Sequence, residues 1–253
     1  KPIIGIEAYV APSTRKSRVQ EFWGTSRDAG DPDAEGGKDV SGGGRYTHMT
    51  MWAKDSEGLH NLFRLSSLAS YEGYYMKPRM DRELMGQYSG GIIASTGCPS
   101  GEVQTRLRLG QFEEACQAAS DYRDIFGREN YFCELMDHGV PIEKQVRSDL
   151  LKLAKKLDIP LLVTNDSHYV TEDQADAHDS LLCVGVGRNK DDPNRFRFNG
   201  SGYYIKSSEQ MRALFPDHPE ACDNTLLLTE MIGSYDEVFK YVDRMPQFDV
   251  PEG

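Results

Sequence analysis

The chain has 253 residues, a formal net charge of −11 and a mean hydropathy of −0.58, a size that suits one large α/β domain or two smaller ones. It contains no apolar run long enough to span a membrane. Its negative net charge argues against a basic surface that binds nucleic acid by counterion release. Its five scattered cysteines, without a Cys-x-x-Cys pair, indicate reduced thiols and a cytoplasmic protein.

The chain begins directly in an apolar strand at residues 3–10, without an initiator Met, so we expect a fragment cut inside a domain. Glu7 lies within this strand, where a carboxylate is costly unless it is paired, bound to something or exposed at an edge. The polar, Gly-rich and Asp-rich residues 11–45 are expected to form a long flexible loop that is either functional or disordered.

The alternating residues 46–53 predict a second strand, in which His48 is either a packed core histidine or a metal ligand. An amphipathic helix should follow to about residue 71, with Asp55 or Ser56 as its N-cap.

A short helix is expected at 81–88 and a third strand at 90–96. That strand ends in a tight turn around Cys98, whose thiol could be a nucleophile, a metal ligand or a small side chain that fits the turn. Two helices should follow, the second over 111–126 with Gly127 as its C-cap.

Residues 131–136 predict a fourth strand that contains Glu134 and is closed by a turn with His138. Residues 142–157 are amphipathic at helical spacing. The apolar run at 161–163 then predicts a fifth strand over 159–165, buried on both faces as in a parallel sheet.

Polar side chains follow directly after this fifth strand. Asp166 and His168 are two apart, so they would point to one side of a continuing strand and could bind a divalent cation, although Asp166 could instead cap a helix while His168 packs. Thr171 should cap a helix that carries His178 as a structural residue. The remaining predictions are a strand at 203–206 and helices at 207–215 and 219–232.

The alternation of strands and helices predicts a parallel α/β sheet, either open or closed into a barrel. Four of its strands carry unusual polar residues within them or just past their ends, namely Glu7, His48, Cys98, Asp166 and His168. Since chemistry gathers at the carboxyl ends of parallel strands, we expect these residues to converge on one site. Their oxygen, nitrogen and sulfur donors suit a cluster of divalent metal ions.

Together these segments resemble the PHP (polymerase and histidinol phosphatase) domain of bacterial DNA polymerase III alpha subunits. The motifs are Gly-Ile-Glu-Ala-Tyr-Val at 5–10, Tyr-Thr-His at 46–48, Gly-Cys-Pro-Ser-Gly-Glu at 97–102, Glu-Leu-Met-Asp-His-Gly at 134–139 and Thr-Asn-Asp-Ser-His-Tyr-Val at 164–170. The resemblance implies a distorted (β/α)7-type barrel that lacks its first strands here. It also implies a metal-binding domain over 1–235 and a linker toward a polymerase palm domain over 236–253.

Carried over by position, the resemblance implies that the metal ligands are Glu7, His48, Cys98, Asp166 and His168. Of these, Asp166, His168 and Glu7 would also serve catalysis, while Glu134, His138 and His178 would support the ligands. The family's His-x-His motif would lie upstream of this chain. A cysteine thiolate favours zinc, manganese or iron over magnesium, which would belong to the palm domain beyond residue 253.

The resemblance further implies that the parent protein is a DNA-directed DNA polymerase of chromosomal replication. Its partners would be a DNA primer-template, the sliding clamp and other holoenzyme subunits, with no membrane. The segment itself would be a metal-dependent 3′-5′ exonuclease that removes a mispaired nucleotide. One alternative is a non-catalytic, metal-stabilised scaffold that supports the polymerase and docks a separate proofreading subunit. Another is a phosphatase for a small phosphomonoester.

Overall fold

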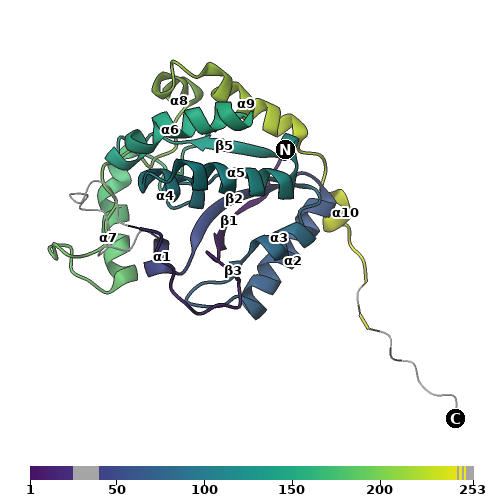
Figure 1. The fold of residues 1–253 in the computed structure, drawn as a ribbon. Helices are drawn as coiled ribbons and strands as arrows, with labels where there is room; N and C mark the ends of the chain where they lie inside the picture. The colour runs from purple at the N-terminus through teal and green to yellow at the C-terminus, as the bar shows by residue number, and fades with distance from the viewer. Residues whose placement is uncertain (25–39, 244, 247, 249–253) are drawn as a thin grey trace, which may run out of the picture.

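The computed structural model describes residues 1–24, 40–243, 245–246 and 248, and its centre is a six-stranded sheet with the order β3-β1-β2-β4-β5-β6 (Figure 1). The strands are β1 (Gly5–Val10), β2 (Thr47–Ala53), β3 (Arg79–Met80), β4 (Ile92–Ser95), β5 (Tyr131–Leu135) and β6 (Leu161–Val163). The protein therefore has a mixed α/β architecture, as the sequence predicts, and the first five predicted strands all form.

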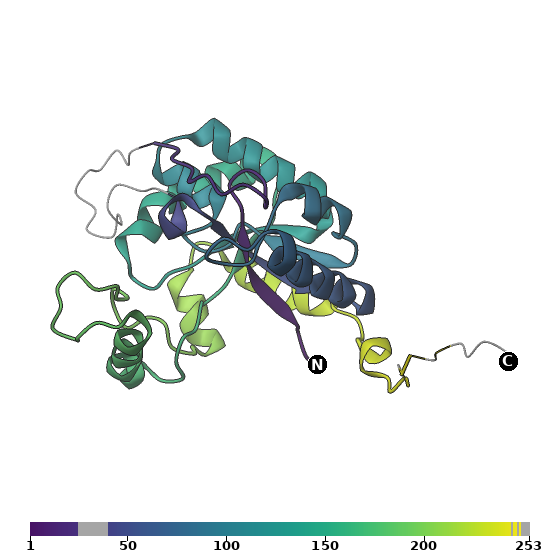
Figure 2. The same ribbon diagram turned by 90° about the horizontal axis from the view of Figure 1, so that it is seen from below.

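Helices cover the sheet and connect its strands. They are α1 (Ser41–Gly44), α2 (Ser56–Glu72), α3 (Arg82–Gln87), α4 (Glu102–Arg108), α5 (Phe112–Phe126), α6 (Pro141–Leu157), α7 (Ala175–Val186), α8 (Ser208–Leu214), α9 (Pro219–Met231) and α10 (Asp236–Phe239). Helices α4, α5 and α6 pack on one another, α5 also packs against β4 and β5, α6 packs against β5, and α9 packs along β6. Figure 2 shows α7 set to one side of the sheet. No helix in the described ranges combines the length and apolar character needed to cross a bilayer.

The sheet is mixed, which corrects the expectation of an all-parallel sheet. Strand β2 pairs antiparallel with both β1 and β4, whereas β1 with β3, β4 with β5 and β5 with β6 are parallel pairs. The register pairs Val10 with Thr47, so β2 starts beside the end of β1. A parallel neighbour requires a crossover that carries the chain back along the sheet. In the described part of the connection from 11 to 46 there is only the short helix α1, and β2 returns directly.

Local signals in the sequence correctly located the helix ends. Asp55 and Asp81 cap α2 and α3, each side chain accepting a hydrogen bond from the backbone N–H three residues on. Thr171 forms the predicted capping box, which opens with a single 3₁₀ turn before α7. Gly127 ends α5 with a φ of 90°.

Two predictions about extended chain are wrong. Strand β6 ends at Val163, and Asp166 has a φ of 29°, so no strand continues through it. The predicted strand at 203–206 is a single bridge between Tyr169 and Tyr204. In these segments polar side chains bond to backbone carbonyls: Asn165 Nδ2 donates to that of Tyr204, and His168 Nδ1 lies 2.8 Å from that of Asp166.

The described part of the expected flexible loop is anchored. Arg15 is buried, and its guanidinium Nη1 lies 2.9 Å from Asp81 Oδ1. Arg79 is also buried and donates hydrogen bonds to four backbone carbonyls, including those of Arg15 and Ser17. These contacts hold the chain before residue 25 against β3, while residues 25–39 lie outside the described part.

Candidate metal centre

Several polar residues lie at one end of the sheet, where its parallel strands finish. Strands β1, β4, β5 and β6 run in one direction and end there, while β2, which runs the other way, begins there. Glu7 lies in β1, His48 is the second residue of β2, and Cys98 follows β4. His48, near the amino end of β2, therefore lies beside the carboxyl ends of the neighbouring strands β1 and β4.

Glu7, His48 and Cys98 form a tight group. Glu7 Oε1 lies 2.7 Å from His48 Nδ1, and Cys98 Sγ lies 3.5 Å from the same nitrogen and 3.9 Å from Glu7 Oε1. One donor atom from each residue lies within 4.8 Å of the others. The Glu7 side chain is 54% exposed and that of His48 is 21% exposed, so an ion from solvent can reach the group.

The turn after β4 holds Cys98 in this position. Gly97 adopts a φ of 79°, and a Cβ on it would meet the carbonyl oxygen of His48 at 3.0 Å, so the turn requires glycine. The backbone N–H of His48 donates to the carbonyl of Ser100 at 3.1 Å. The turn therefore packs directly on the start of β2, and this contact fixes the distance between the thiol and the imidazole.

Asp166 and His168 lie on the loop after β6, within electrostatic reach of this group but not inside it. His168 Nδ1 is 2.8 Å from the carbonyl oxygen of Asp166 and 3.8 Å from its Oδ1. The backbone N–H of His168 donates to the carbonyl of Tyr203 at 2.8 Å. The hydrogen bond from His48 is the main cause of the lowered pKa of Glu7, and the charge of His168 makes a smaller contribution in the same direction.

Hydrogen bonding, burial and neighbouring charges shift the pKa values of these side chains. The hydrogen bond from His48 lowers the pKa of Glu7, although partial burial opposes this effect. Burial, followed by the nearby Glu7 carboxylate, raises the pKa of the Cys98 thiol far above its usual range, and burial also raises the pKa of Asp166. A divalent cation would offset the negative charge of the carboxylates and would displace the proton of the Cys98 thiol. Carboxylate, imidazole and thiolate donors fit zinc, iron or manganese.

Glu134 lies beneath the group as a support. This buried carboxylate of β5 accepts hydrogen bonds from the hydroxyls of Ser95, Thr164 and Thr50, the Thr164 bond being 2.5 Å long. Burial raises its pKa despite these bonds. Because its lone pairs are engaged by three neighbouring chain segments, Glu134 connects the ends of these segments instead of facing a ligand.

His138 supports the loop that carries Asp166. Its Nδ1 lies 2.5 Å from Glu143 Oε1, its backbone N–H donates to Glu143 Oε2 at 2.7 Å, and its Nε2 lies 3.1 Å from the carbonyl oxygen of Asn165. Burial lowers the pKa of His138, but the hydrogen bond and charge of Glu143, together with the Asn165 carbonyl and the charge of Asp166, give a net upward shift. The ring is thus buried and fully bonded, and it ties α6 to the loop after β6.

Aromatic rings surround His168. Its ring centroid lies 4.6 Å from that of Phe198, which meets it edge-on, and 5.5 Å from that of His178. Tyr203 stacks on His138 with centroids 4.3 Å apart. Burial, then the charge of His168, lowers the pKa of His178. His178 therefore packs against His168 as a structural neighbour.

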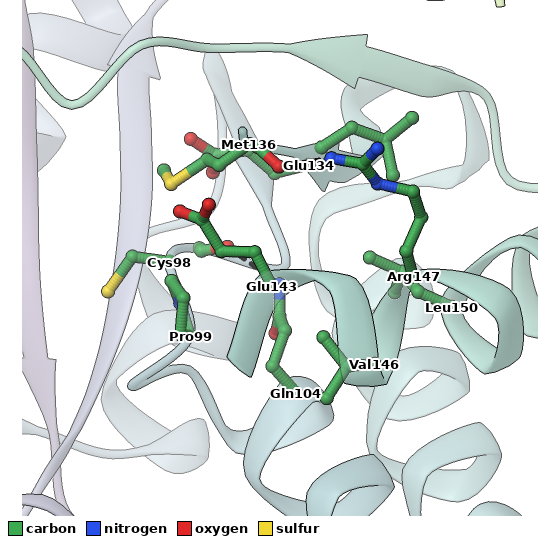
Figure 3. A pocket seen from close by; sticks show the side chains of 11 residues that line it. Cys98, Pro99, Gln104, Glu134, Met136, Glu143, Val146, Arg147 and Leu150 are labelled. Atoms are coloured by element: carbon green, nitrogen blue, oxygen red, sulfur yellow. Dashed lines mark hydrogen bonds between the residues drawn. The ribbon is translucent and has the colours of Figure 1, made fainter. Parts of the chain in front are cut away.

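A small hollow lies behind Cys98. Figure 3 shows Cys98 at one side of it and Arg147 at the other, with Glu134 and Glu143 between them. Arg147 pairs with Asp137, its Nη2 lying 2.8 Å from Oδ2, so its charge is already balanced. Of the two acidic side chains in the lining, Glu134 adds a small contribution to the burial that raises the pKa of the Cys98 thiol.

Sequence reasoning missed Glu143 and Tyr203, which hold His138. Glu143 lies in the first turn of α6 after Pro141, where an acidic residue also fits the helix dipole, and that ordinary role conceals its bond to His138. No spacing in the sequence signals the stacking of Tyr203, because it depends on how the loop at 199–206 folds back.

The fold and the donor group define an α/β domain with a candidate metal centre at one edge of its sheet. Residues 1–138 match the family described as PHP domain, and the chain belongs to that family. The proteins named DNA polymerase III subunit alpha from Saccharopolyspora erythraea and Mycobacterium tuberculosis are 59% and 54% identical to it, over 98% and 100% of the chain. That of Thermus aquaticus is 37% identical over 100% of the chain. The chain spans about a fifth of the length of these relatives.

Proposed function

We propose that the chain is the PHP domain of a DNA polymerase III alpha subunit and that it hydrolyses the terminal phosphodiester at a DNA 3′ end. The observation that carries this proposal is the group of Glu7, His48 and Cys98, whose donor atoms lie within 4.8 Å of one another. The relatives that match 98% and 100% of the chain supply the context, since each is named DNA polymerase III subunit alpha.

The proposed ligands are Glu7, His48, Cys98, Asp166 and His168, which would hold zinc, manganese or iron. When bound, such ions stabilise charge on a phosphoryl oxygen and lower the pKa of a coordinated water. The hydrogen bond between His168 Nδ1 and the Asp166 carbonyl leaves Nε2 as the ring nitrogen that faces a ligand or moves a proton. Glu7 and Asp166 supply the hard oxygen donors and hold the negative charge that attracts the cations.

The proposal extends to the parent protein. There the segment 1–235 would be the metal-binding domain, 236–253 would lead toward a palm domain that uses magnesium, and further strands would close the sheet into a barrel. The proposed location is cytoplasmic, and the proposed partners are the DNA primer-template, the sliding clamp and other replicase subunits. A structure of the whole protein in which the sheet stays open would contradict the barrel.

The test uses the full-length protein that contains this chain. Removal of a mismatched 3′ nucleotide is followed in wild type, Asp166→Asn and His168→Ala, with bound metal quantified in parallel. His60→Ala, which replaces an exposed histidine of α2, is the matched control. We expect both site variants to lose cleavage and keep polymerisation, while the control retains both. Loss of both activities in the site variants, with metal still bound in wild type, would contradict a separate hydrolytic site.

A non-catalytic metal scaffold is the second candidate. It is favoured by the origin of the three grouped donors, which come from β1, β2 and the turn after β4, so one ion would tie three chain segments together. In this role the domain would support the polymerase and dock a separate proofreading subunit. Metal in the wild-type protein without any 3′ cleavage would select this candidate.

A further inference from the structure

Aromatic rings lead away from the metal centre along the sheet. The ring of Tyr46 stacks on His48, with centroids 5.7 Å apart and an interplanar angle of 14°. Tyr9, which is paired with His48 in the register of β1 and β2, meets both rings edge-on at 4.8 and 5.3 Å. Both tyrosines are partly exposed. A partly exposed cluster of aromatic rings, with Tyr46 stacked on His48 and Tyr9 edge-on to both, therefore begins at a candidate metal ligand.

Cationic side chains continue this surface. Lys77 Nζ lies 5.2 Å from the ring centroid of Tyr9. Next to it, the ring of Tyr75 has three guanidinium groups within 5.7 Å, those of Arg18, Arg45 and Arg79. Lys77 and Arg18 are exposed, whereas Arg79 is buried and bound to backbone carbonyls. The exposed cations are thus held in place over rigid rings.

Within the part of the chain that the structure describes, no salt bridge balances this positive charge. In the described ranges, the hydrogen bonds of the three arginines go to backbone carbonyls or to Tyr75, and neither they nor Lys77 form a salt bridge. The neighbouring Arg15, by contrast, pairs with three carboxylates. In a chain with a net charge of −11, such a cluster indicates a site for an external anion.

We propose that Tyr9, Tyr46, Lys77, Arg18 and Arg45, here called the aromatic-cationic track, bind single-stranded DNA next to its 3′ end and lead that end to the metal centre. The bases stack on the two tyrosines, and the phosphates contact the lysine and the arginines. Arg79 positions the track from beneath. The inference rests on the proposed function and deepens it by naming residues that hold the substrate.

The chemistry of the track selects unpaired DNA. Stacking on a protein ring needs a base whose face is free, which a single strand or a frayed mispaired end offers and an intact duplex does not. Alternation of rings and cations also matches the alternation of bases and phosphates. A small phosphate ester would use the cations but gain nothing from the stacked tyrosines.

The first experiment maps contacts in the full-length protein. Single-stranded DNA with 5-iodouracil at its 3′-terminal positions is irradiated with the protein in chelator, and the cross-linked peptides are identified by mass spectrometry. We expect cross-links at Tyr9 or Tyr46, and loss of these cross-links in Lys77→Gln but not in Lys155→Gln, which replaces an exposed lysine of α6. Cross-links confined to peptides outside 1–80 would overturn the inference.

The second experiment measures turnover with the bound metal restored. We expect Lys77→Gln to raise the KM for single-stranded 3′ ends roughly 3- to 10-fold, to leave kcat within about 2-fold, and to reduce the slope of log affinity against log salt by about 0.7. A KM unchanged from that of Lys155→Gln would overturn the inference. Cross-links at the tyrosines without cleavage by the wild type would support the track while rejecting the hydrolytic function.

Discussion

Glu143→Ala should loosen the loop that carries Asp166 and His168. The carboxylate of Glu143 is buried and binds both the imidazole and the backbone N–H of His138, whose Nε2 in turn lies against the carbonyl of Asn165. Removing one partner of a buried, hydrogen-bonded ion pair costs roughly 3–5 kcal/mol, because the other partner stays buried without compensation. The loss should act locally, where α6 meets the loop after β6.

Hydrogen exchange in the full-length protein measures this effect. A loss of about 3 kcal/mol corresponds to roughly 100-fold faster exchange of the protected amides at 134–138 and 161–168. Metal affinity should fall as well, since Asp166 and His168 lose a fixed position. Glu114→Ala, which removes an exposed carboxylate from α5, is the control and should leave exchange unchanged. If Glu143→Ala exchanged at the wild-type rate, the support ascribed to His138 would be wrong.

Three further predictions concern pH, metal choice and the anchored loop. Since Glu143 raises the pKa of His138 above its ordinary 6.5, the pair stabilises the fold fully below about pH 6.5 and loses this contribution as the pH rises through the folded-state pKa. The difference in urea stability between wild type and Glu143→Gln should therefore narrow as the pH rises, and a constant difference would refute the linkage. Cys98→Ser should weaken zinc binding at least about 10-fold and manganese binding less, as measured by chelator competition, because the soft sulfur donor is lost; equal losses would exclude the thiolate as a ligand. Arg79→Met removes four hydrogen bonds to carbonyls at a cost of roughly 3 kcal/mol, and limited proteolysis should then cut within 11–24 faster than in wild type; an unchanged cleavage rate would show that Arg79 does not anchor this segment.

The sequence by itself determined the local elements. Alternation and apolar runs predicted the strands, and Asp55 and Thr171 marked helix starts because a short polar side chain satisfies backbone N–H groups that the helix leaves unpaired. The polar residues at strand ends were also visible, because carboxylates and imidazoles are costly in a buried strand without a partner.

The tertiary structure decided which of these residues meet. The antiparallel direction of β2 brings His48 to Glu7 and Cys98, whereas Asp166 and His168 lie on a turn beside the group. Strand direction and loop return depend on contacts between residues far apart in the chain, which no local pattern encodes.

The buried residues that support the site, Glu143 and Arg79, likewise acquire their partners only in the folded structure. From the sequence, Glu143 is an ordinary acidic residue in the first turn of a helix. Arg79 has no sequence feature that distinguishes it from a surface cation. Their roles arise only after folding, when burial removes water and leaves the His138 imidazole or backbone carbonyls as their partners. Sequence therefore determined the elements and the candidate donors, and tertiary packing decided the grouping, because burial and long-range pairing set the energies of polar groups.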